Sequence, residues 1–326
     1  MLKIFNPEQF QGPKTLQSSK GYFEGWYYKA VSSEGNTIAI IVGLALNRDK
    51  QHAFIQTINS PDGTTTYNSF DISEFSTTQK PFSVSIGKNF FSKDKIFVGD
   101  RTEISGEVEI SDMIPLPVTI FRPGIMGWFS YLPKMECYHG VVSLRHTVNG
   151  CFSLANKKIN FVDSNGYIEK DWGTSFPESY VWMQSNNFST PENSFMLSIA
   201  KIPWLNKYFR GFLGFLNIKD RIIIFSTYTS SVLNILEIDE NHIKVVITGK
   251  GLGLNKSLKR GEIITIDASR EVVSNLIGPV IGDMDRRIGE SIDAKISVKY
   301  YKNKQCMFND TGTNSGLEIV GDTSIL

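Results

Sequence analysis

Residues 21–29 read GYFEGWYYK, and residues 179–187, early in the second half of the chain, read SYVWMQSNN. Each stretch is rich in aromatic side chains around a central tryptophan, a composition that favours a β-strand. The resemblance between them suggests that one β unit occurs twice in the chain. We place the boundary after residue 165, which predicts a first domain over residues 1–165 and a second over residues 166–326.

Alternation of apolar and polar residues with a period of two runs through most of the chain. It is clear in residues 243–248 and 294–301, and such alternation is typical of half-buried strands. Turn residues, among them Asn149-Gly150 and residues 164–166, separate many of the apolar runs. The pattern predicts an all-β protein of antiparallel barrels or sandwiches, with a short helix or irregular cover only at residues 270–288. Comparable runs lie at residues 51–59, 82–86, 103–110, 140–148, 195–202, 210–218 and 221–229.

Residues 112–134, DMIPLPVTIFRPGIMGWFSYLPK, interrupt the alternation. Their four prolines argue against a central strand, because proline cannot donate to a sheet ladder. The segment is also too apolar for a solvated loop. Long loops of this kind often cover a functional site. We interpret the segment as a lid, with an inter-domain plug as the alternative.

Charge and cysteine content exclude several classes of protein. The chain has 34 basic and 33 acidic residues and no cluster of Lys and Arg, which argues against a nucleic-acid partner. Three widely spaced cysteines argue against a disulfide framework and fit a reducing compartment. Neither the N-terminal residues nor the apolar run at 38–46 has the length of a signal peptide core or a membrane span. We therefore expect a cytoplasmic protein with at most peripheral membrane contact.

Glu24 is the first candidate for chemistry. It shares one face of a predicted strand with Trp26 and Tyr28, because side chains alternate along a strand. A carboxyl group desolvated between two rings has a raised pKa and favours its neutral form, which can donate a proton. The alternative is that Glu24 pairs with a lysine or arginine and that Trp26 is a packing residue of the barrel.

Residues 168–184, IEKDWGTSFPESYVWMQ, form the second constellation. Glu169 and Asp171 precede Trp172 at a predicted turn. On the strand that follows, indole and amide groups share one face and can orient a polar head group; the alternative is a solvated acidic turn before a core strand. The residues of that face are Tyr180, Trp182, Gln184 and Asn186.

Residues 135–146, MECYHGVVSLRH, form the third. Glu136 and Tyr138 share a face, and His139 points to the other face if the strand is regular. With an ordinary pKa near 6.5, His139 suits a base or a proton donor, and a core histidine is the alternative. The four histidines do not have metal-ligand spacing, so no metal site is predicted. Neither a Gly-x-Ser-x-Gly elbow nor a phosphate-binding loop is present.

Three segments in combination, YFEGWYYK, PGIMGWFSYLPKMECYHGVVS and EKDWGTSFPESYVWMQSN, resemble the tocopherol cyclase family. Its members carry FEGWYF and EKNWG-x-x-FP-x-x-x-x-W-x-Q segments in this order, and the late GDMDRRIGESIDAKISVKYY fits the family's final strand region. Asp171, Tyr28 and Ser185 depart from the family's usual Asn, Phe and Cys. The resemblance implies a lipocalin-like, calycin-type fold, here two consecutive antiparallel lipocalin-like β-barrels.

The resemblance also implies closure of a chromanol ring on a prenylated (hydro)quinone. A proton adds to a double bond of the tail, and the phenol oxygen attacks the tertiary cation, so no cofactor is expected. The candidate catalytic residues are Glu24, Asp171, Glu169, Glu136 and His139. The candidate substrate-binding residues are Trp26, Tyr28, Trp128, Tyr138, Trp172, Phe176, Trp182, Gln184 and Asn186.

The expected partner is an apolar small molecule, a prenylquinone or another isoprenoid, with no obligate protein partner. Because a fold does not fix a function, three alternatives stay open. The barrels could carry an isoprenoid without changing it, hydrate its double bond, or form a scaffold with a filled interior.

Overall fold

The computed structural model describes residues 3–14, 16, 21–48, 50–60, 62–154, 157–204, 207–219 and 221–326. Strands dominate these residues and the helices among them are short 3-10 turns, which confirms the predicted all-β class. None of the described helices has the length and hydropathy needed to cross a membrane. The chain divides into two compact units, Met1–Phe176 with Asn275–Ile288, and Pro177–Ser274 with Gly289–Leu326.

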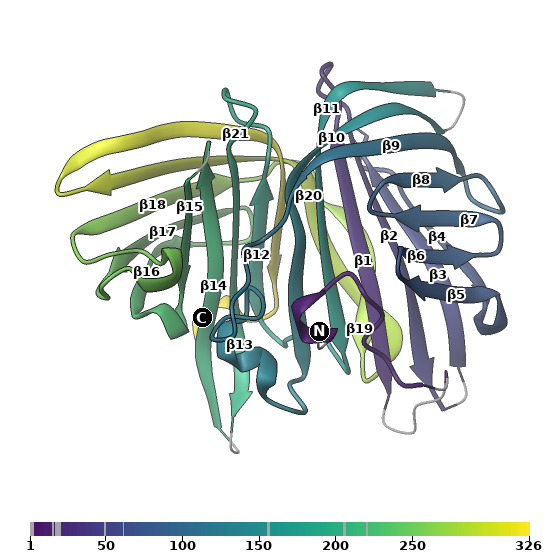
Figure 1. Ribbon diagram of the computed structural model, residues 1–326, viewed down its shortest axis with the longest axis horizontal. Coiled ribbons are helices and arrows are strands. Elements are labelled where there is room, and N and C mark those ends of the chain that lie inside the picture. The colour runs from purple at the N-terminus through teal and green to yellow at the C-terminus, as the bar shows by residue number, and fades with distance from the viewer. Residues whose placement is uncertain are drawn as a thin grey trace. The chain divides into compact units, whose positions relative to one another are not determined.

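The first unit contains an 11-stranded antiparallel sheet in the order β4-β3-β2-β1-β11-β10-β9-β8-β7-β6-β5 (Figure 1). Its edge strands β4 and β5 are consecutive in the chain and are joined by one 3-10 turn, so the sheet curls into a nearly closed barrel. The strands are β1 (Tyr22–Val31), β2 (Thr37–Asn47), β3 (Lys50–Asn59), β4 (Thr65–Asp71), β5 (Phe75–Gln79), β6 (Phe82–Ile86), β7 (Asn89–Ser92), β8 (Lys95–Val98), β9 (Ile104–Ile114), β10 (Cys137–Leu154) and β11 (Lys157–Gly173). The 3-10 turns are η1 (Lys3–Phe5), η2 (Ile72–Glu74) and η3 (Gly127–Tyr131).

The second unit is built on a 10-stranded sheet in the order β15-β14-β13-β12-β21-β20-β18-β17-β16, with β19 paired to β20 outside this path. Residues 275–288 of this sheet, which form most of β19 and the beginning of β20, belong to the first unit. The strands are β12 (Tyr180–Ser185), β13 (Ser194–Trp204), β14 (Lys207–Ile218), β15 (Arg221–Ser226), β16 (Ser231–Ile238), β17 (His242–Gly249), β18 (Glu262–Ser269), β19 (Ser274–Val280), β20 (Asp283–Lys302) and β21 (Gln305–Val320). The 3-10 turns are η4 (Thr227–Thr229), η5 (Leu254–Lys256) and η6 (Thr323–Ile325).

The two sheets share one topology. In each, the first strand pairs with the last, the next three strands lead to one edge, and the remaining strands lead to the other. The two aromatic segments of the sequence occupy equivalent places, because they form β1 and β12, the first strand of each sheet. The predicted all-β fold of two antiparallel units is confirmed, with a nearly closed barrel in the first unit and a second sheet in the other.

An apolar cluster lies on the inner face of each sheet. Trp26 and Phe91 belong to the first cluster, and Phe195 and Phe225 to the second. Trp26 is fully buried, and its indole N–H donates to the carbonyl oxygen of Glu8 at 2.7 Å. The structure therefore agrees with the alternative in which Trp26 is a packing residue.

Two predicted turns are wrong, because both lie inside long strands. Asn149-Gly150 lies within β10, where a shift in register and a positive φ of 135° at Gly150 mark a β-bulge. Residues 164–166 lie within β11 and pair with β10 and β1. The boundary predicted after residue 165 likewise falls inside β11, whereas the first unit extends to Phe176.

The helix or irregular cover predicted at residues 270–288 is also wrong, because this region holds β19 and the beginning of β20. Residues 275–288 belong to the first unit although they are late in the chain. The Gln56 side-chain amide accepts from the backbone N–H of Ile277 at 2.8 Å, and the Gly282 N–H donates to the Thr174 carbonyl at 2.8 Å. These contacts explain why the first unit is not continuous in sequence.

Candidate active site

The register of β1, β10 and β11 divides the candidate residues of the first unit between two faces of the sheet. Glu24 and Tyr138 both lie opposite Trp172, whereas His139 and Gly25 lie opposite Asp171. Because neighbouring residues of a strand point to opposite faces, these two rows face opposite sides. The inner group is Glu24, Trp26, Tyr28, Tyr138 and Trp172; the outer group is His139, Glu169 and Asp171.

Glu24 forms a buried ion pair in the inner group. Its Oε1 lies 2.5 Å from Nζ of Lys170, and both side chains are fully buried. The backbone N–H of Gln11 and the hydroxyl of Tyr22 also donate to this carboxylate. The prediction of an isolated Glu24 is therefore wrong, and the alternative of a lysine partner is the one observed.

The inner aromatic rings surround this ion pair. The Lys170 Nζ lies 4.7 Å from the ring centre of Trp26 and 4.9 Å from that of Trp172, and it donates to the Gln9 carbonyl at 2.6 Å. Burial lowers the pKa of Lys170 to about 8, although Glu24 opposes the shift. Tyr138 stacks on Trp172 with the rings 5.5 Å apart. These rings stabilise a structural cation, which differs from their predicted role in substrate binding.

Tyr28, the remaining inner candidate, lies in the core cluster beside Phe91. Its buried hydroxyl has no hydrogen-bond partner among the described residues, and burial raises its pKa. It borders a small pocket that is also lined by Ile40 and His146. Tyr28 therefore faces the interior of the barrel, as its strand pattern predicted.

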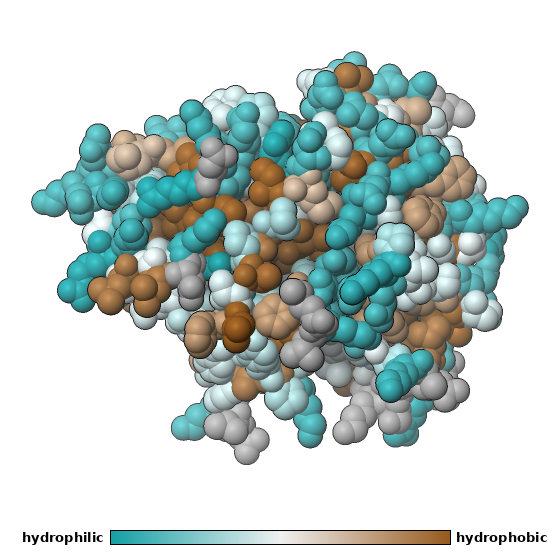
Figure 2. Space-filling model, in the orientation of Figure 1, coloured by the Kyte–Doolittle hydropathy of each residue, from teal (hydrophilic) through white to brown (hydrophobic). Residues whose placement is uncertain are grey.

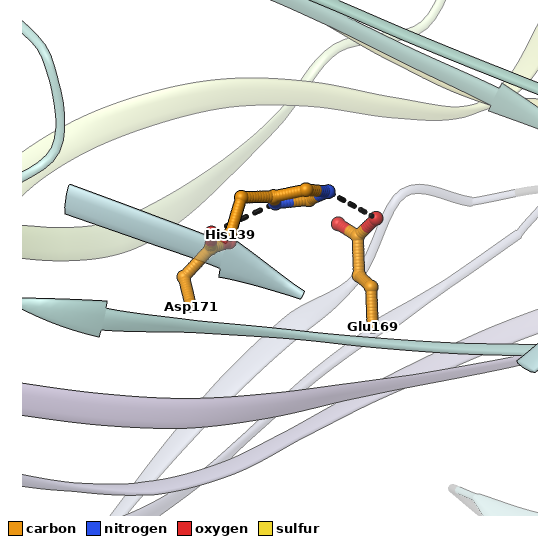
Figure 3. A group of neighbouring side chains, drawn as sticks. All are labelled: His139, Glu169 and Asp171. Carbon is orange, nitrogen blue, oxygen red and sulfur yellow. Dashed lines mark hydrogen bonds and ion pairs between the residues drawn. The ribbon is translucent and has the colours of Figure 1, made fainter. Parts of the chain in front are cut away.

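The outer group brings one imidazole between two carboxylates (Figure 3). Nδ1 of His139 lies 2.8 Å from Oδ1 of Asp171, and its Nε2 lies 3.5 Å from Oε2 of Glu169. The hydroxyl of Tyr167 donates to the same Glu169 oxygen at 2.6 Å. We refer to His139, Glu169 and Asp171 as the acid–histidine cluster. Its members come from β10 and β11 and meet because these strands are adjacent.

The carboxylates determine the charge of His139. Burial by itself would lower the pKa of this imidazole, but the charges of Asp171 and Glu169 and the hydrogen bond to Asp171 outweigh burial and raise it to about 9. At neutral pH the cluster thus holds one dissociable proton. Because the three side chains interact closely, this proton belongs to the cluster as a whole. Asp171 is the member that reaches outward, with 24% of its side chain exposed against 6% for Glu169.

An aromatic ring that the sequence analysis missed lies in the same row. Asp171, Gly25, Gly43 and Phe54 are successive register partners across four strands. A Cβ at Gly43 would lie 2.8 Å from the tip of the Phe54 ring, and a Cβ at Gly25 would lie 3.9 Å from it. The ring therefore extends over both glycines toward Asp171. The only signal in the sequence is an aromatic residue in a predicted strand, which does not separate a site from a core.

The predicted lid covers the strand that carries His139. Residues 112–114 still belong to β9, and the segment leaves the sheet after Ile114. Ile125 and Met126 are buried, and the backbone N–H of His139 donates to the sulfur of Met126 at 3.1 Å. Trp128 is instead 46% exposed and stacks on Phe129. Met126 therefore contacts the backbone of His139, and the interpretation of the segment as a lid stays a prediction.

The other candidates lie apart from this cluster. The Phe176 ring meets Phe23 edge to face at 5.3 Å. Glu136 precedes β10, and its carbonyl accepts from the N–H of Thr174 at 2.8 Å. In the second unit the predicted common face of β12 is observed and is buried, opposite the core face, and the Gln184 amide donates to Asn186 at 3.3 Å. The residues of this face are Tyr180, Trp182 and Gln184 of β12, and Asn186 directly follows the strand.

The acid–histidine cluster also has the composition of a metal site. Within the described part of the chain it is the one group whose His, Cys, Asp or Glu ligand atoms all lie within 4.8 Å of one another. One imidazole and two carboxylates suit a divalent transition metal. The absence of a metal, expected from the histidine spacing, stays a prediction.

Comparison with known proteins shows a family to which the region of this site is similar. Residues 119–202, which contain residues 119–134 of the predicted lid and the acid–histidine cluster, match a family model described as tocopherol cyclase-like. This region is therefore similar to that family. The match confirms the resemblance predicted from the sequence, and it includes two of the three motifs, since YFEGWYYK lies before it.

A probable chloroplastic tocopherol cyclase of Oryza sativa subsp. japonica is 26% identical over 83 residues. The matched stretch is 26% of this chain and 18% of the rice protein. Two crystal structures share the fold across nearly the whole chain. CghA has a TM-score of 0.55 at 10% identity, covering 94% of this chain and 90% of CghA. Kievitone hydratase from Nectria haematococca has a TM-score of 0.52 at 11% identity, covering 93% and 90%.

Two buried histidines predict how stability depends on pH. The pKa of His139 is about 9 in the fold against 6.5 ordinarily, so its bound proton stabilises the fold below pH 6.5 and this contribution is lost as the pH rises toward 9. Burial, aided by the charge of Arg145, lowers the pKa of His146 to about 3, so acidification below pH 6.5 favours the unfolded chain. Urea denaturation across the pH range should give the largest free energy of unfolding at about pH 6.5.

The decisive window is pH 6.5 to 7, because Lys170, whose pKa is about 8, begins to lose its proton above it. In this window the His139→Gln protein should lose the decline in stability that the original protein shows. A decline of equal slope in both proteins would contradict the assignment to His139.

Proposed function

We propose that the protein is a tocopherol cyclase-like enzyme that closes a chromanol ring on a prenylated (hydro)quinone. The observation that carries this proposal is the acid–histidine cluster, in which a buried, protonated imidazole lies between two carboxylates. Such a group stores the proton that cyclisation requires. The tocopherol cyclase-like region that contains it supports the same reaction class.

The proposed reaction moves one proton out of the cluster and returns one. The proton on Nδ1 of His139 passes to Asp171, the outward-reaching carboxyl group, and from there to a carbon of the tail double bond. The π electrons of that bond form the new C–H bond and leave a tertiary cation. The phenol oxygen attacks the cation, and its proton returns to Asp171. Substrate and product therefore have the same composition.

The surroundings of Asp171 suit a cation intermediate. The Phe54 ring extends toward Asp171 over Gly43 and Gly25, and an aromatic face stabilises a nearby cation by about 0.5–2 kcal/mol. The cluster itself is left with an additional negative charge when it gives up its proton, which also favours a cation nearby. The lid residue Met126, packed at His139, reduces the access of water.

The experiment that tests the proposal is incubation of the purified chain with a prenylated hydroquinone, followed by mass spectrometry. A product of unchanged mass that lacks one phenolic hydroxyl is the expected result. Recovery of the substrate unchanged, although it binds, would favour an isoprenoid carrier. That outcome would overturn the enzymatic proposal.

Hydration of the double bond is the second candidate, and the shared fold of kievitone hydratase favours it. The protonation step is the same, but water instead of the phenol oxygen attacks the cation. The product would then be heavier by one water molecule. The same mass spectrum therefore separates cyclase, hydratase and carrier.

A further inference from the structure

A two-residue turn in the lid exposes two large apolar side chains. Thr119 and Arg122 form an isolated antiparallel bridge, with the Thr119 N–H donating to the Arg122 carbonyl at 2.8 Å and the reverse bond at 3.0 Å. Ile120 and Phe121 lie at the tip and are 75% and 80% exposed. Gly, Asn and Asp dominate such tips, so an Ile-Phe pair serves neither turn geometry nor solubility.

The tip is held rigidly. The Arg122 guanidinium, which is buried, donates to the Pro117 carbonyl at 3.0 Å, and the Tyr131 hydroxyl donates to the Ile120 carbonyl at 2.7 Å. Behind the tip, Ile125 is fully buried. These hydrogen bonds therefore hold the backbone that carries the two exposed side chains.

Aromatic residues with partial exposure accompany the tip. Trp128 and Tyr131 are about half exposed, and the Tyr131 hydroxyl bond to Ile120 places Tyr131 beside the tip. Trp and Tyr are enriched where a protein meets the headgroup layer of a bilayer, because their rings have an apolar body and a polar end. Figure 2 shows apolar residues reaching the surface at several places among polar ones. The tip differs from scattered exposure because four large apolar side chains gather in one short segment.

The segment has no charge that an anionic surface would repel. Between Asp112 and Glu136 the chain contains no acidic residue, and of its two basic residues Arg122 is buried and Lys134 is exposed. An exposed lysine near exposed apolar and aromatic side chains suits the interface of a membrane with anionic lipids.

We propose that residues 118–131 dock the protein on an anionic lipid bilayer, with Ile120 and Phe121 inserted among the acyl chains and Trp128 and Tyr131 at the headgroups. An apolar ligand dissolved in the bilayer would then meet the segment whose other side packs on His139 through Met126. Membrane docking is a property separate from the cyclase reaction, and its test uses no substrate. Failure to bind vesicles and failure to cyclise a prenylated hydroquinone can therefore be told apart.

The test is co-sedimentation of the full chain with vesicles of phosphatidylcholine and phosphatidylglycerol. The Ile120→Ser/Phe121→Ser protein should bind the vesicles at least about tenfold more weakly, because it lacks two large apolar side chains that would transfer from water into the bilayer. The matched control is Leu252→Ser/Leu254→Ser, which alters two leucines of the second unit that are 86% and 72% exposed. Its binding should equal that of the original protein.

Three results would overturn the proposal. The original chain could fail to bind vesicles, the Ile120→Ser/Phe121→Ser protein could bind them as tightly as the original, or both double variants could lose the same amount of vesicle binding. Circular dichroism of the variants controls for folding. If sedimentation velocity shows that the tip substitutions only dissociate a dimer and leave vesicle binding intact, the tip binds a second copy of the chain instead. The intrinsic fluorescence of Trp128 gives an independent readout, since its blue shift on vesicles should disappear in Trp128→Phe.

Discussion

A Lys170→Met protein is expected to lose about 3–5 kcal/mol of unfolding free energy, the range observed when one partner of a buried ion pair is removed. The substitution leaves the Glu24 carboxylate fully buried without its cation. It also removes the ammonium group that lies between the rings of Trp26 and Trp172. Urea denaturation at neutral pH, with the slope compared between proteins, measures the loss.

The matched control for this effect is the double variant Glu24→Gln/Lys170→Met. Removing both charges abolishes the penalty of an unpaired buried carboxylate, so the double variant should be more stable than Lys170→Met alone. If the double variant were less stable than the single one by the full cost of a second, independent substitution, Glu24 and Lys170 would not act as a pair.

Asp171→Asn is expected to lower turnover of a prenylated hydroquinone by about a hundredfold to ten-thousandfold, the usual contribution of a positioned acid. An amide cannot accept the proton from His139 and pass it on, although its size is nearly that of the carboxylate. The charge that raises the pKa of His139 is lost at the same time. Initial rates measured by mass spectrometry give the comparison.

Asp163→Asn is the control, because Asp163 lies on the same strand, β11, and is exposed. It should retain the original rate. Glu24→Gln should also keep its rate per folded molecule and lose only stability. Loss of turnover in Glu24→Gln with no change in Asp171→Asn would return the role of proton donor to Glu24.

Local patterns predicted much of the fold. Alternation identified residues 82–86, which are β6, and residues 51–59, which the structure extends by one residue to β3. It also placed His139 on the face opposite Tyr138. These predictions succeeded because the periodicity of a strand depends only on neighbouring residues.

The pairing of distant strands was not predictable from such patterns. Glu24 looked like an isolated acid because its partner, Lys170, is on β11, and only the register of β1 against β11 brings them together. Glu169, Asp171 and His139 were each identified, but their assembly needs the register of β10 against β11. Gly150 was taken for a turn because a glycine in a bulge and a glycine in a turn have the same local signature.

The proposed reaction depends on a protonated His139 held between Asp171 and Glu169. Nitrogen-15 NMR of the histidine side chains, with His139 assigned by its loss in His139→Gln, measures this directly during a pH titration. We predict that both ring nitrogens of His139 stay protonated through neutral pH and titrate with a pKa of about 9. A pKa at or below the ordinary 6.5 would contradict the account, because the cluster would then hold no proton to deliver.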